Sequence, residues 1–284
     1  MSNARLLSAF VAAYPAQPAT AYWRAIEIGA LVRLGLPEGL GLDLGCGDGI
    51  LTDILLRHAG ARQLVGVDLD PLETKAAEKF PFYLRLHVAP GNAIPEQSGT
   101  FDFVLANSVL EHIPGLDGTI AESARVLRQG GRFLFTVPGP AFHANLRGPL
   151  WPGVARSAYL ETLDRRIVHY HYWSVADWEA TAARHGMVLD GCLGYFGAVE
   201  TRRWETLSRM TGGLLYSLLG ETRRPIEIQR RLGMRDMQNK GGLPGALAGA
   251  IASAISLGAP VDRNENRWLD ANRASCLLVH GTKL

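Results

Sequence analysis

A glycine-rich turn between a short apolar strand and a helix constrains this chain more than any other feature. The stretch Leu42–Gly49 reads LDLGCGDG and carries Gly45, Gly47 and Gly49. Glycine has no Cβ, so a backbone with alternate glycines can pass close to a ligand. A second apolar strand ends about 20 residues later at Asp68, whose carboxylate suits the two hydroxyls of a ribose. Together, the turn and the acid predict a site for a nucleoside-containing cofactor.

Two cofactors compete for this turn. Dinucleotide-binding folds favour G-x-G-x-x-G, in which the third glycine lets the helix pack on the strand. Gly45 and Gly47 fit, but Ile50 stands at the third position, and Gly49 gives D-x-G-x-G-x-G with Asp43 inside the strand. An acid such as Asp43 suits the ammonium group of S-adenosylmethionine (SAM), directly or through water. The turn therefore favours SAM over a nicotinamide dinucleotide, and a tight turn with glycines for geometry alone is the structural alternative.

The composition is that of an ordinary soluble globular protein. The 284 residues are 47% apolar and 20% charged, and the formal net charge of +2 gives no argument for nucleic acid as a partner. Cys46, Cys192 and Cys276 are far apart and form no C-x-x-C pair, so neither a zinc site nor a disulfide framework is predicted. A reducing, cytoplasmic location is the default expectation. Neither a signal-peptide pattern nor a membrane-spanning apolar run is recognised.

Apolar strands alternate with helices along the first half of the chain, which predicts an α/β fold with a doubly wound parallel sheet. After Pro138, several prolines predict a long irregular stretch. Regular structure returns at Ser174, an N-cap with Asp177 in the capping-box position. The predicted strands are 40–44, 64–68, 83–88, 101–106, 132–137, 187–193 and 275–280, and the predicted helices are 19–34, 50–58, 71–79, 119–127 and 174–185.

The chain resembles the small-molecule, type 11 group of class I SAM-dependent methyltransferases. The matching features, in order over about residues 38–140, are Leu42–Gly49, Asp68, Gly91–Ala93 before Ser98–Asp102, and Asn107–His112 before Arg125–Gly131. The resemblance implies a Rossmann-like seven-stranded sheet with an antiparallel last strand, with SAM as the cofactor. With the long gap between the last two predicted strands, the expected organisation is an N-terminal helical cap (1–37), a SAM-binding core (38–195) with a substrate segment (138–173), a helical insertion (196–273) and the last core strand (274–284).

The resemblance implies cofactor contacts along the carboxyl ends of the strands. Asn92 departs from the group, which often has Asp there, but its amide still offers a donor and an acceptor to adenine. Strand four does not exit as N-P-P-Y, the form found in enzymes that methylate amino groups of adenine or glutamine. Asn107 is neutral, so no magnesium site is predicted, and no metal is expected. The implied cofactor contacts are Asp43, Gly45, Cys46, Gly47, Asp68, Leu69, Asn92, Ala93, Asn107 and His112.

The acceptor is not specified by these motifs. His169 and His171 lie in the densest aromatic segment and are candidate general bases, since the pKa of histidine lies near working pH. Tyr170 and Trp173 of the same segment are candidate substrate contacts, and so are Tyr14 and Tyr22 of the N-terminal segment. The structural alternative is that these rings pack in the core.

The insertion at 196–273 carries two apolar segments, at 213–219 and 243–257, around a stretch with five arginines at 223, 224, 230, 231 and 235. It is expected either to be a lid over an apolar acceptor or to make peripheral membrane contact. The leading function is methyl transfer from SAM to a small-molecule acceptor of secondary or lipid metabolism, including isoprenoid-like compounds. The alternatives are an NAD(P)-dependent oxidoreductase and a catalytically silent SAM-binding protein.

Overall fold

The computed structural model describes residues 2–213 and 243–284. The chain divides into two compact units, each assembled from three segments. The first unit comprises residues 1–30, 141–169 and 195–269, and the second comprises 31–140, 170–194 and 270–284. The five arginines at 223–235 and the apolar segment 214–219 lie outside the described residues. Among the described helices, none has both the length and the hydropathy that a membrane span requires.

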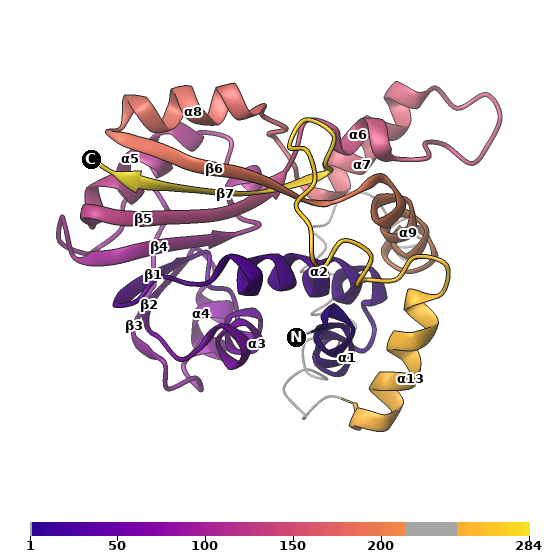
Figure 1. Ribbon diagram of the computed structural model, residues 1–284, viewed down its shortest axis with the longest axis horizontal. Helices are drawn as coiled ribbons and strands as arrows, with labels where there is room; N and C mark the ends of the chain where they lie inside the picture. Colours follow the sequence, from indigo (N-terminus) through magenta and orange to yellow (C-terminus); the bar gives the residue numbers. More distant parts are fainter. Residues whose placement is uncertain (1, 214–242) are drawn as a thin grey trace. The chain divides into compact units, whose positions relative to one another are not determined.

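The second unit is built on a seven-stranded sheet with the order β3-β2-β1-β4-β5-β7-β6 (Figure 1). Strands β1 to β5 pair in parallel, whereas β7 runs antiparallel to β5. The predicted doubly wound sheet with an antiparallel last strand is therefore confirmed. The strands are β1 (Leu40–Leu44), β2 (Gln63–Asp68), β3 (Tyr83–Val88), β4 (Phe101–Asn107), β5 (Leu127–Pro138), β6 (Met187–Phe196) and β7 (Cys276–Lys283).

The centre of the sheet is formed by β1 and β4, which lie side by side with Leu42 opposite Val104. Both side chains are fully buried, as expected for near-continuous apolar strands covered on two faces. The chain runs from β1 to β2 on one side, while β4 begins the other half of the sheet. This reversal is a topological switch point, and ligands of open α/β sheets bind there, beyond the carboxyl ends of the strands.

The helices of the second unit follow their strands as the sequence predicts. They are α3 (Ile50–Ala59), α4 (Pro71–Ala77), α5 (Leu116–Val126) and α8 (Val175–Arg184), with a short 3-10 turn η1 (Leu110–His112) after β4. The predicted capping box of α8 is confirmed, because Ser174 Oγ accepts from the Asp177 N–H and the Asp177 carboxylate accepts from the Ser174 N–H.

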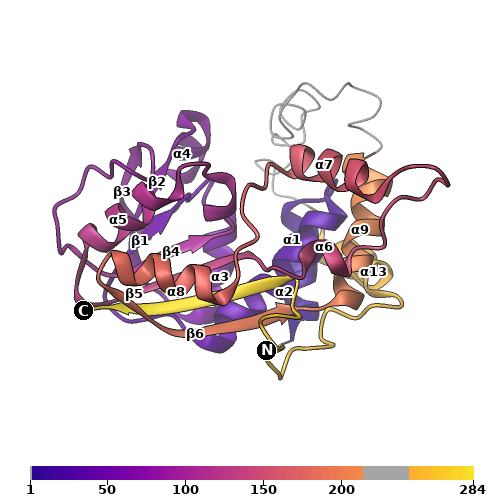
Figure 2. The same cartoon turned by 90° about the horizontal axis from the view of Figure 1, so that it is seen from above.

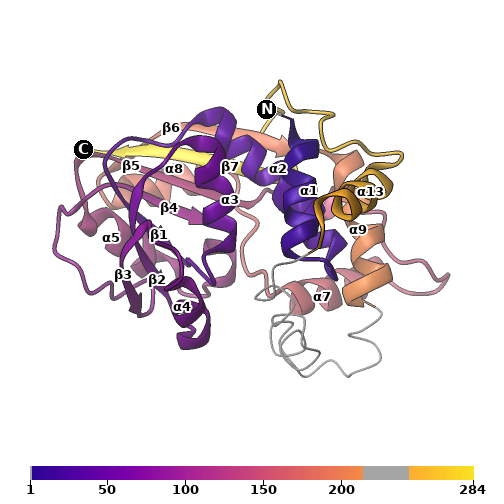
Figure 3. The ribbon, with the colours of Figure 1, turned by 90° about the horizontal axis from the view of Figure 1, so that it is seen from below.

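Aromatic side chains form the core of the first unit. The rings of Trp23, Phe142, Phe196 and Trp204 approach one another with centroids 4.8–5.9 Å apart, in the tilted and edge-on arrangements that aromatic pairs favour. Helix α1 packs beside α13 (Figures 1 and 3). The helices are α1 (Asn3–Ala13), α2 (Pro18–Leu34, whose last turn belongs to the second unit), α6 (Phe142–Asn145), α7 (Arg156–Ile167), α9 (Ala198–Ser208), the π turn η2 (Arg209–Gly213) and α13 (Gly245–Ser256).

Two predictions of secondary structure were wrong. The stretch from Pro138 to Ser174 is not irregular throughout, because α7 occupies Arg156–Ile167. Only Leu163 of that helix is buried, so the sequence lacks the apolar period that identifies a helix. In addition, the strand predicted at 132–137 is longer, because β5 begins at Leu127 and includes Gly130 and Gly131. That strand begins early because Leu127 pairs with Phe101 of β4.

The buried carboxylate of Glu205 organises the polar interior of the first unit. Its side chain on α9 accepts from the backbone N–H groups of Arg147 and Gly148, at 2.8 and 3.2 Å. It also accepts from the Tyr159 hydroxyl at 2.5 Å and from the Arg209 guanidinium at 2.7 Å. These donors compensate a charge whose residue is only 1% exposed. Glu205 thereby ties the loop after α6 to helices α7 and α9.

We expect Glu205→Gln to lower the free energy of unfolding by about 1.5–3 kcal/mol. The neutral side chain loses the charge-assisted hydrogen bonds, and its own NH2 group faces donors that it cannot accept from. The matched control is Glu161→Gln on α7, whose side chain is 74% exposed and which should change stability by less than about 0.5 kcal/mol. Urea unfolding followed by circular dichroism makes the comparison. Equal effects of the two substitutions would contradict the anchoring role of Glu205.

Candidate functional site

The glycine turn after β1 is held against β2 by backbone hydrogen bonds. The N–H groups of Gly45 and Cys46 both donate to the Val67 carbonyl, at 2.7 and 3.1 Å. The Gly49 N–H donates to the Cys46 carbonyl at 3.1 Å. Gly45, Gly47 and Gly49 have φ angles of +75°, +53° and +76°, which residues with a Cβ rarely adopt. The backbone conformation by itself is therefore sufficient to require glycine at all three positions.

The space around the three glycines differs. A Cβ on Gly45 would lie 2.4 Å from Val109, and one on Gly49 would lie 2.6 Å from Phe80. For Gly47, no atom of the described residues other than Gly47 and its two chain neighbours lies within 4 Å of the Cβ position. Packing inside the protein thus explains Gly45 and Gly49. Only Gly47 borders open space, which is where a ligand could approach the backbone.

Asp68 ends β2 beside this turn. Its Oδ2 accepts from the Gly47 N–H and its Oδ1 accepts from the Asp70 N–H, both at 2.9 Å. Each carboxylate oxygen has two lone pairs, so both oxygens keep acceptor capacity for the hydroxyls of a ribose. Leu69, the next residue, is 69% exposed and offers an apolar surface beside the acid.

Asp43 is buried next to the turn rather than open to a ligand. The residue is 3% exposed, and its Oδ2 accepts from the Thr52 hydroxyl at 2.7 Å and from the Tyr83 hydroxyl at 2.5 Å. Burial raises the pKa of Asp43, and the two hydroxyl donors oppose that rise. The carboxylate therefore joins β1 to α3 and β3. This arrangement favours an anchoring role for Asp43, and its predicted contact with an ammonium group stays a prediction.

The loop after β3 presents Asn92 and Ala93 at the surface. The loop is fixed from behind by α5: the Ile94 N–H donates to Glu122 at 2.8 Å, and Arg125 donates to the Ile94 carbonyl at 3.0 Å. Ile94 itself is buried. The two exposed residues are thus held on a rigid base, as an adenine-binding edge requires.

A short chain of hydrogen bonds orients Asn107 at the end of β4. The Ser108 N–H donates to Thr136 Oγ1 at 2.9 Å, and that hydroxyl donates to Asn107 Oδ1 at 2.6 Å. The Asn107 amide nitrogen then faces away from Thr136. Asn107 is 8% exposed, and its Nδ2 is buried with no hydrogen-bond partner among the described residues. A buried donor without an acceptor costs about 1–3 kcal/mol, which a bound ligand at the switch point would recover.

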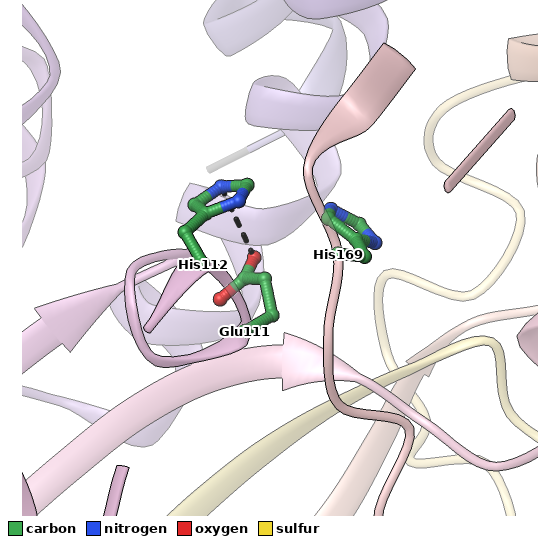
Figure 4. Close-up of side chains that lie close together, drawn as sticks. All are labelled: Glu111, His112 and His169. Carbon is green, nitrogen blue, oxygen red and sulfur yellow. Dashed lines mark ion pairs between the residues drawn. The ribbon is translucent and has the colours of Figure 1, made fainter. Parts of the chain in front are cut away.

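The exit of β4 carries Glu111 and His112 on the turn η1. Figure 4 shows the two side chains rising from this turn, with His112 Nε2 3.9 Å from Glu111 Oε1. The Glu111 side chain is 1% exposed and that of His112 is 39% exposed. His112 is therefore the member of this pair that solvent or a ligand can reach.

The aromatic segment that begins at Tyr170 is bound to this exit, although it lies far away in the sequence. The Tyr170 N–H donates to the Glu111 carbonyl at 2.8 Å, and His171 Nε2 lies 2.7 Å from the Ile113 carbonyl. A carbonyl only accepts, so Nε2 carries the proton and Nδ1 of the neutral ring keeps its lone pair. The second unit thus binds Tyr170 and His171 to the backbone on either side of His112.

The remaining predicted residues are placed as follows. Trp173 packs between His171 and Trp178, at centroid distances of 5.0 and 4.7 Å, and Tyr170 is 56% exposed. His169, also drawn in Figure 4, belongs to the first unit, where its ring lies 6.0 Å from that of Phe142. Their predicted roles are not tested by these positions.

Tyr14 and Tyr22 also belong to the first unit. Tyr14 stacks on Phe10, while Tyr22 is fully buried and donates its hydroxyl to the Ala259 carbonyl at 2.9 Å. Burial raises the pKa of Tyr22. Both rings pack within their own unit, and acceptor contact by either one stays a prediction.

Sequence reasoning missed Thr52, Tyr83 and Thr136. Each acts through a hydroxyl that reaches a site residue from another element. None belongs to a motif, and their spacing from Asp43 and Asn107 carries no signal, because only the folded sheet brings them together.

Comparison with known proteins decides between the cofactors. Residues 42–135 match the family model described as a methyltransferase domain, and this range contains the turn, Asp68, the loop after β3 and the β4 exit. Residues 42–135 are therefore similar in sequence to a methyltransferase domain. This match favours SAM over a nicotinamide dinucleotide at the turn, since SAM is the methyl donor of such a domain.

The relatives resemble this chain over the methyltransferase domain. A ubiquinone biosynthesis O-methyltransferase of Xanthomonas oryzae pv. oryzae is 35% identical over 111 residues, which cover 37% of this chain and 46% of that protein. The chain thus spans about half the length of the curated relatives it matches. A Listeria monocytogenes structure assigned to the SAM-dependent methyltransferases has 18% identity, a TM-score of 0.54 and coverage of 92% of this chain and 98% of that one.

The fold by itself does not specify methyl transfer. The structure of the cyclase SpnF is similar, with a TM-score of 0.53, 15% identity and coverage of 91% of this chain and 80% of that one. The site residues therefore have to carry the argument for function.

The methyltransferase domain has features that fit SAM. The open space at Gly47, the remaining acceptor capacity of Asp68 and the buried donor of Asn107 all lie beyond the carboxyl ends of β1, β2 and β4. Gly47 and Asp68 would hold the ribose side, Leu69, Asn92 and Ala93 the adenine, and Asn107 and His112 the methionine end.

We expect Gly47→Ala to weaken SAM binding at least about tenfold, because its methyl group would enter the open space at the turn where the ligand is expected to lie. Gly35→Ala is the matched control, since Gly35 has φ +85° and also no described atom within 4 Å. Both substitutions carry a backbone cost of about 1–2 kcal/mol. Isothermal titration with SAM should separate them, and equal affinities in both variants would remove Gly47 from the cofactor site.

We expect Tyr83→Phe to destabilise the protein in a pH-dependent way. The Tyr83 bond lowers the pKa of Asp43, which burial raises above its ordinary value. Without the hydroxyl, the folded-state pKa rises further, so ionisation of Asp43 costs more stability. The difference from wild type should be small in acid, where Asp43 is protonated in both proteins, and should grow as the pH rises through the pKa of Asp43. Urea unfolding across this range measures it, and a difference independent of pH would contradict the Asp43 assignment.

Proposed function

We propose that this protein transfers the methyl group of SAM to a hydroxyl oxygen of a small, mostly apolar acceptor. The methyltransferase domain supports the reaction class, and the relative named as an O-methyltransferase supports oxygen as the acceptor atom. The observation that carries the proposal is the docking of the Tyr170–Trp173 segment on the β4 exit, since it sets a histidine beside the expected methionine end of SAM.

The chemistry requires alignment and one proton transfer. Bound SAM supplies a methyl group on a positively charged sulfur, which is a good leaving group. In the proposed reaction, the acceptor oxygen would bond to the methyl carbon while the carbon–sulfur bond breaks, and the electron pair of that bond would stay on sulfur. Positioning of two reactants can contribute about 7–11 kcal/mol. In the proposal, the site residues mainly hold the acceptor in line with the methyl group.

His171 is the general base that this geometry favours. Its Nε2–H is fixed by the Ile113 carbonyl, so Nδ1 is the atom that takes the proton of the acceptor hydroxyl. Trp173 and Tyr170 flank the ring at 5.0 and 6.5 Å between centroids and would provide apolar walls for the acceptor. His169 remains the second candidate base.

The insertion at 196–273 is proposed to cover the acceptor. Its described part forms α9, η2 and α13 within the first unit. The apolar sequence of α13, with Ala248, Ala252 and Ile255 buried, suits packing within a cap. This role is expected to affect the acceptor range more than the affinity for SAM.

We expect His171→Ala to reduce turnover by about 10²–10⁴-fold, the usual contribution of a general base, with SAM affinity within about twofold of wild type. His185→Ala is the control, because His185 also pairs through Nε2, with Asp117 at 3.0 Å, but lies at the end of α8. The assay is transfer of labelled methyl from SAM across a panel of phenols and other hydroxylated apolar compounds.

The matched substitution at the other candidate base provides the second readout. If His169→Ala loses turnover while His171→Ala keeps it, the base is His169. If SAM binds but no acceptor in the panel is methylated, O-methyl transfer is not supported and a binding protein without turnover is the better reading.

A further inference from the structure

The loop between α6 and α7 exposes large apolar side chains. Leu150 and Trp151 are 71% and 77% exposed, and Val154 is 45% exposed. We call Gly148–Ala155 the Trp151 loop. In Figures 1 and 2 it extends outward beyond the neighbouring helices α6, α7 and α9 of its unit. Tryptophan is usually well buried, and several apolar side chains gathered on a projecting loop mark an interaction site.

The Trp151 loop is held firmly at its base. Arg156 donates to the His143 and Leu146 carbonyls, at 2.5 and 3.2 Å, and Glu205 accepts from the backbone N–H groups of Arg147 and Gly148. Arg209 also donates to the Gly148 carbonyl. Pro149 and Pro152 on either side of the exposed pair fix φ near −65°. The exposure of Leu150 and Trp151 is therefore built into the loop and does not result from a lack of local contacts.

The base of the loop is positively charged. Arg147 and Arg156 are both exposed, and among the described residues neither has a carboxylate partner. Arg156 donates its hydrogen bonds to backbone carbonyls. Glu205 is buried and already paired with Arg209. The loop thus combines an apolar tip with uncompensated cations behind it.

We propose that the Trp151 loop docks on an anionic lipid surface, with Leu150 and Trp151 at the level of the headgroups and Arg147 and Arg156 facing the lipid phosphates. Tryptophan concentrates at membrane–water interfaces, and basic residues near the surface add attraction to anionic lipids. A stable protein interface needs about 20–30 residues on each side, far more than this loop offers. This proposal does not depend on the proposed methyl transfer.

Flotation of the full chain with vesicles tests the proposal. We expect binding to vesicles of phosphatidylcholine with phosphatidylglycerol, and weaker binding to phosphatidylcholine alone. The double variant Leu150→Ser, Trp151→Ser should bind at least about tenfold more weakly, since it removes the two exposed apolar side chains that binding to the lipid surface would bury. Val188→Ser is the control, because Val188 is 48% exposed on β6 and its substitution should have no effect on binding.

The charge contribution is tested separately. Arg147→Gln should weaken binding to anionic vesicles about fivefold, while the backbone N–H of residue 147 still donates to Glu205.

Tryptophan fluorescence gives a readout that does not depend on the double variant folding. Brominated lipids should quench part of the wild-type emission, and Trp151→Phe should lose that quenching while it still floats with the vesicles. The proposal is overturned if the intact protein does not float with anionic vesicles, or if the double variant floats as well as wild type. It is also overturned if the double variant loses only self-association in analytical ultracentrifugation, because the loop then binds a second copy.

Discussion

The buried carboxylate of Asp43 is the interaction on which the cofactor site depends. It lies on the central strand β1, two residues before the glycine turn begins at Gly45, and it accepts from Thr52 on α3 and Tyr83 on β3. A strand, a helix and a second strand are thus fixed to one point beside the turn. The same burial that raises the pKa of Asp43 makes the two hydroxyl donors necessary, since an ionised carboxylate without partners is costly. The turn can stay open at Gly47 because the contacts of Asp43 with α3 and β3 fix the end of β1 from which the turn starts.

Much of the second unit could be predicted from the sequence, because the sequence patterns that identify its elements are local. Each strand is a short apolar run, the turn carries its own glycines, and Ser174 and Asp177 form a cap with each other. Helix α7 could not be predicted, since only Leu163 of its residues is buried. Thr52, Tyr83 and Thr136 could not be found either, because each reaches its partner across the sheet. The motif identified Asn107, but only the hydrogen bond from Thr136 shows which way its amide is turned.

The two units bury charge in different ways. In the second unit, polar groups at the strand ends keep unused capacity: Asp68 can accept more hydrogen bonds, and the Asn107 amide has a donor without a described partner. In the first unit, Glu205 is enclosed by donors, and Glu200 accepts from Asn264 and from the Gly197 N–H. Unused capacity is typical of a ligand site, whereas full compensation is typical of structural anchors. On this basis the strand ends of the second unit have the character of a ligand site, and Glu205 and Glu200 have that of structural anchors.

One residue of the glycine turn has a consequence for redox chemistry. Cys46 is 6% exposed, and burial, with Asp43 and Asp68 nearby, raises the pKa of its thiol. Only the thiolate reacts readily with oxidants and alkylating agents, so a thiol that stays protonated and covered is inert. Although a cysteine stands in the middle of the cofactor turn, oxidative conditions that modify exposed thiols should leave this turn chemically unchanged.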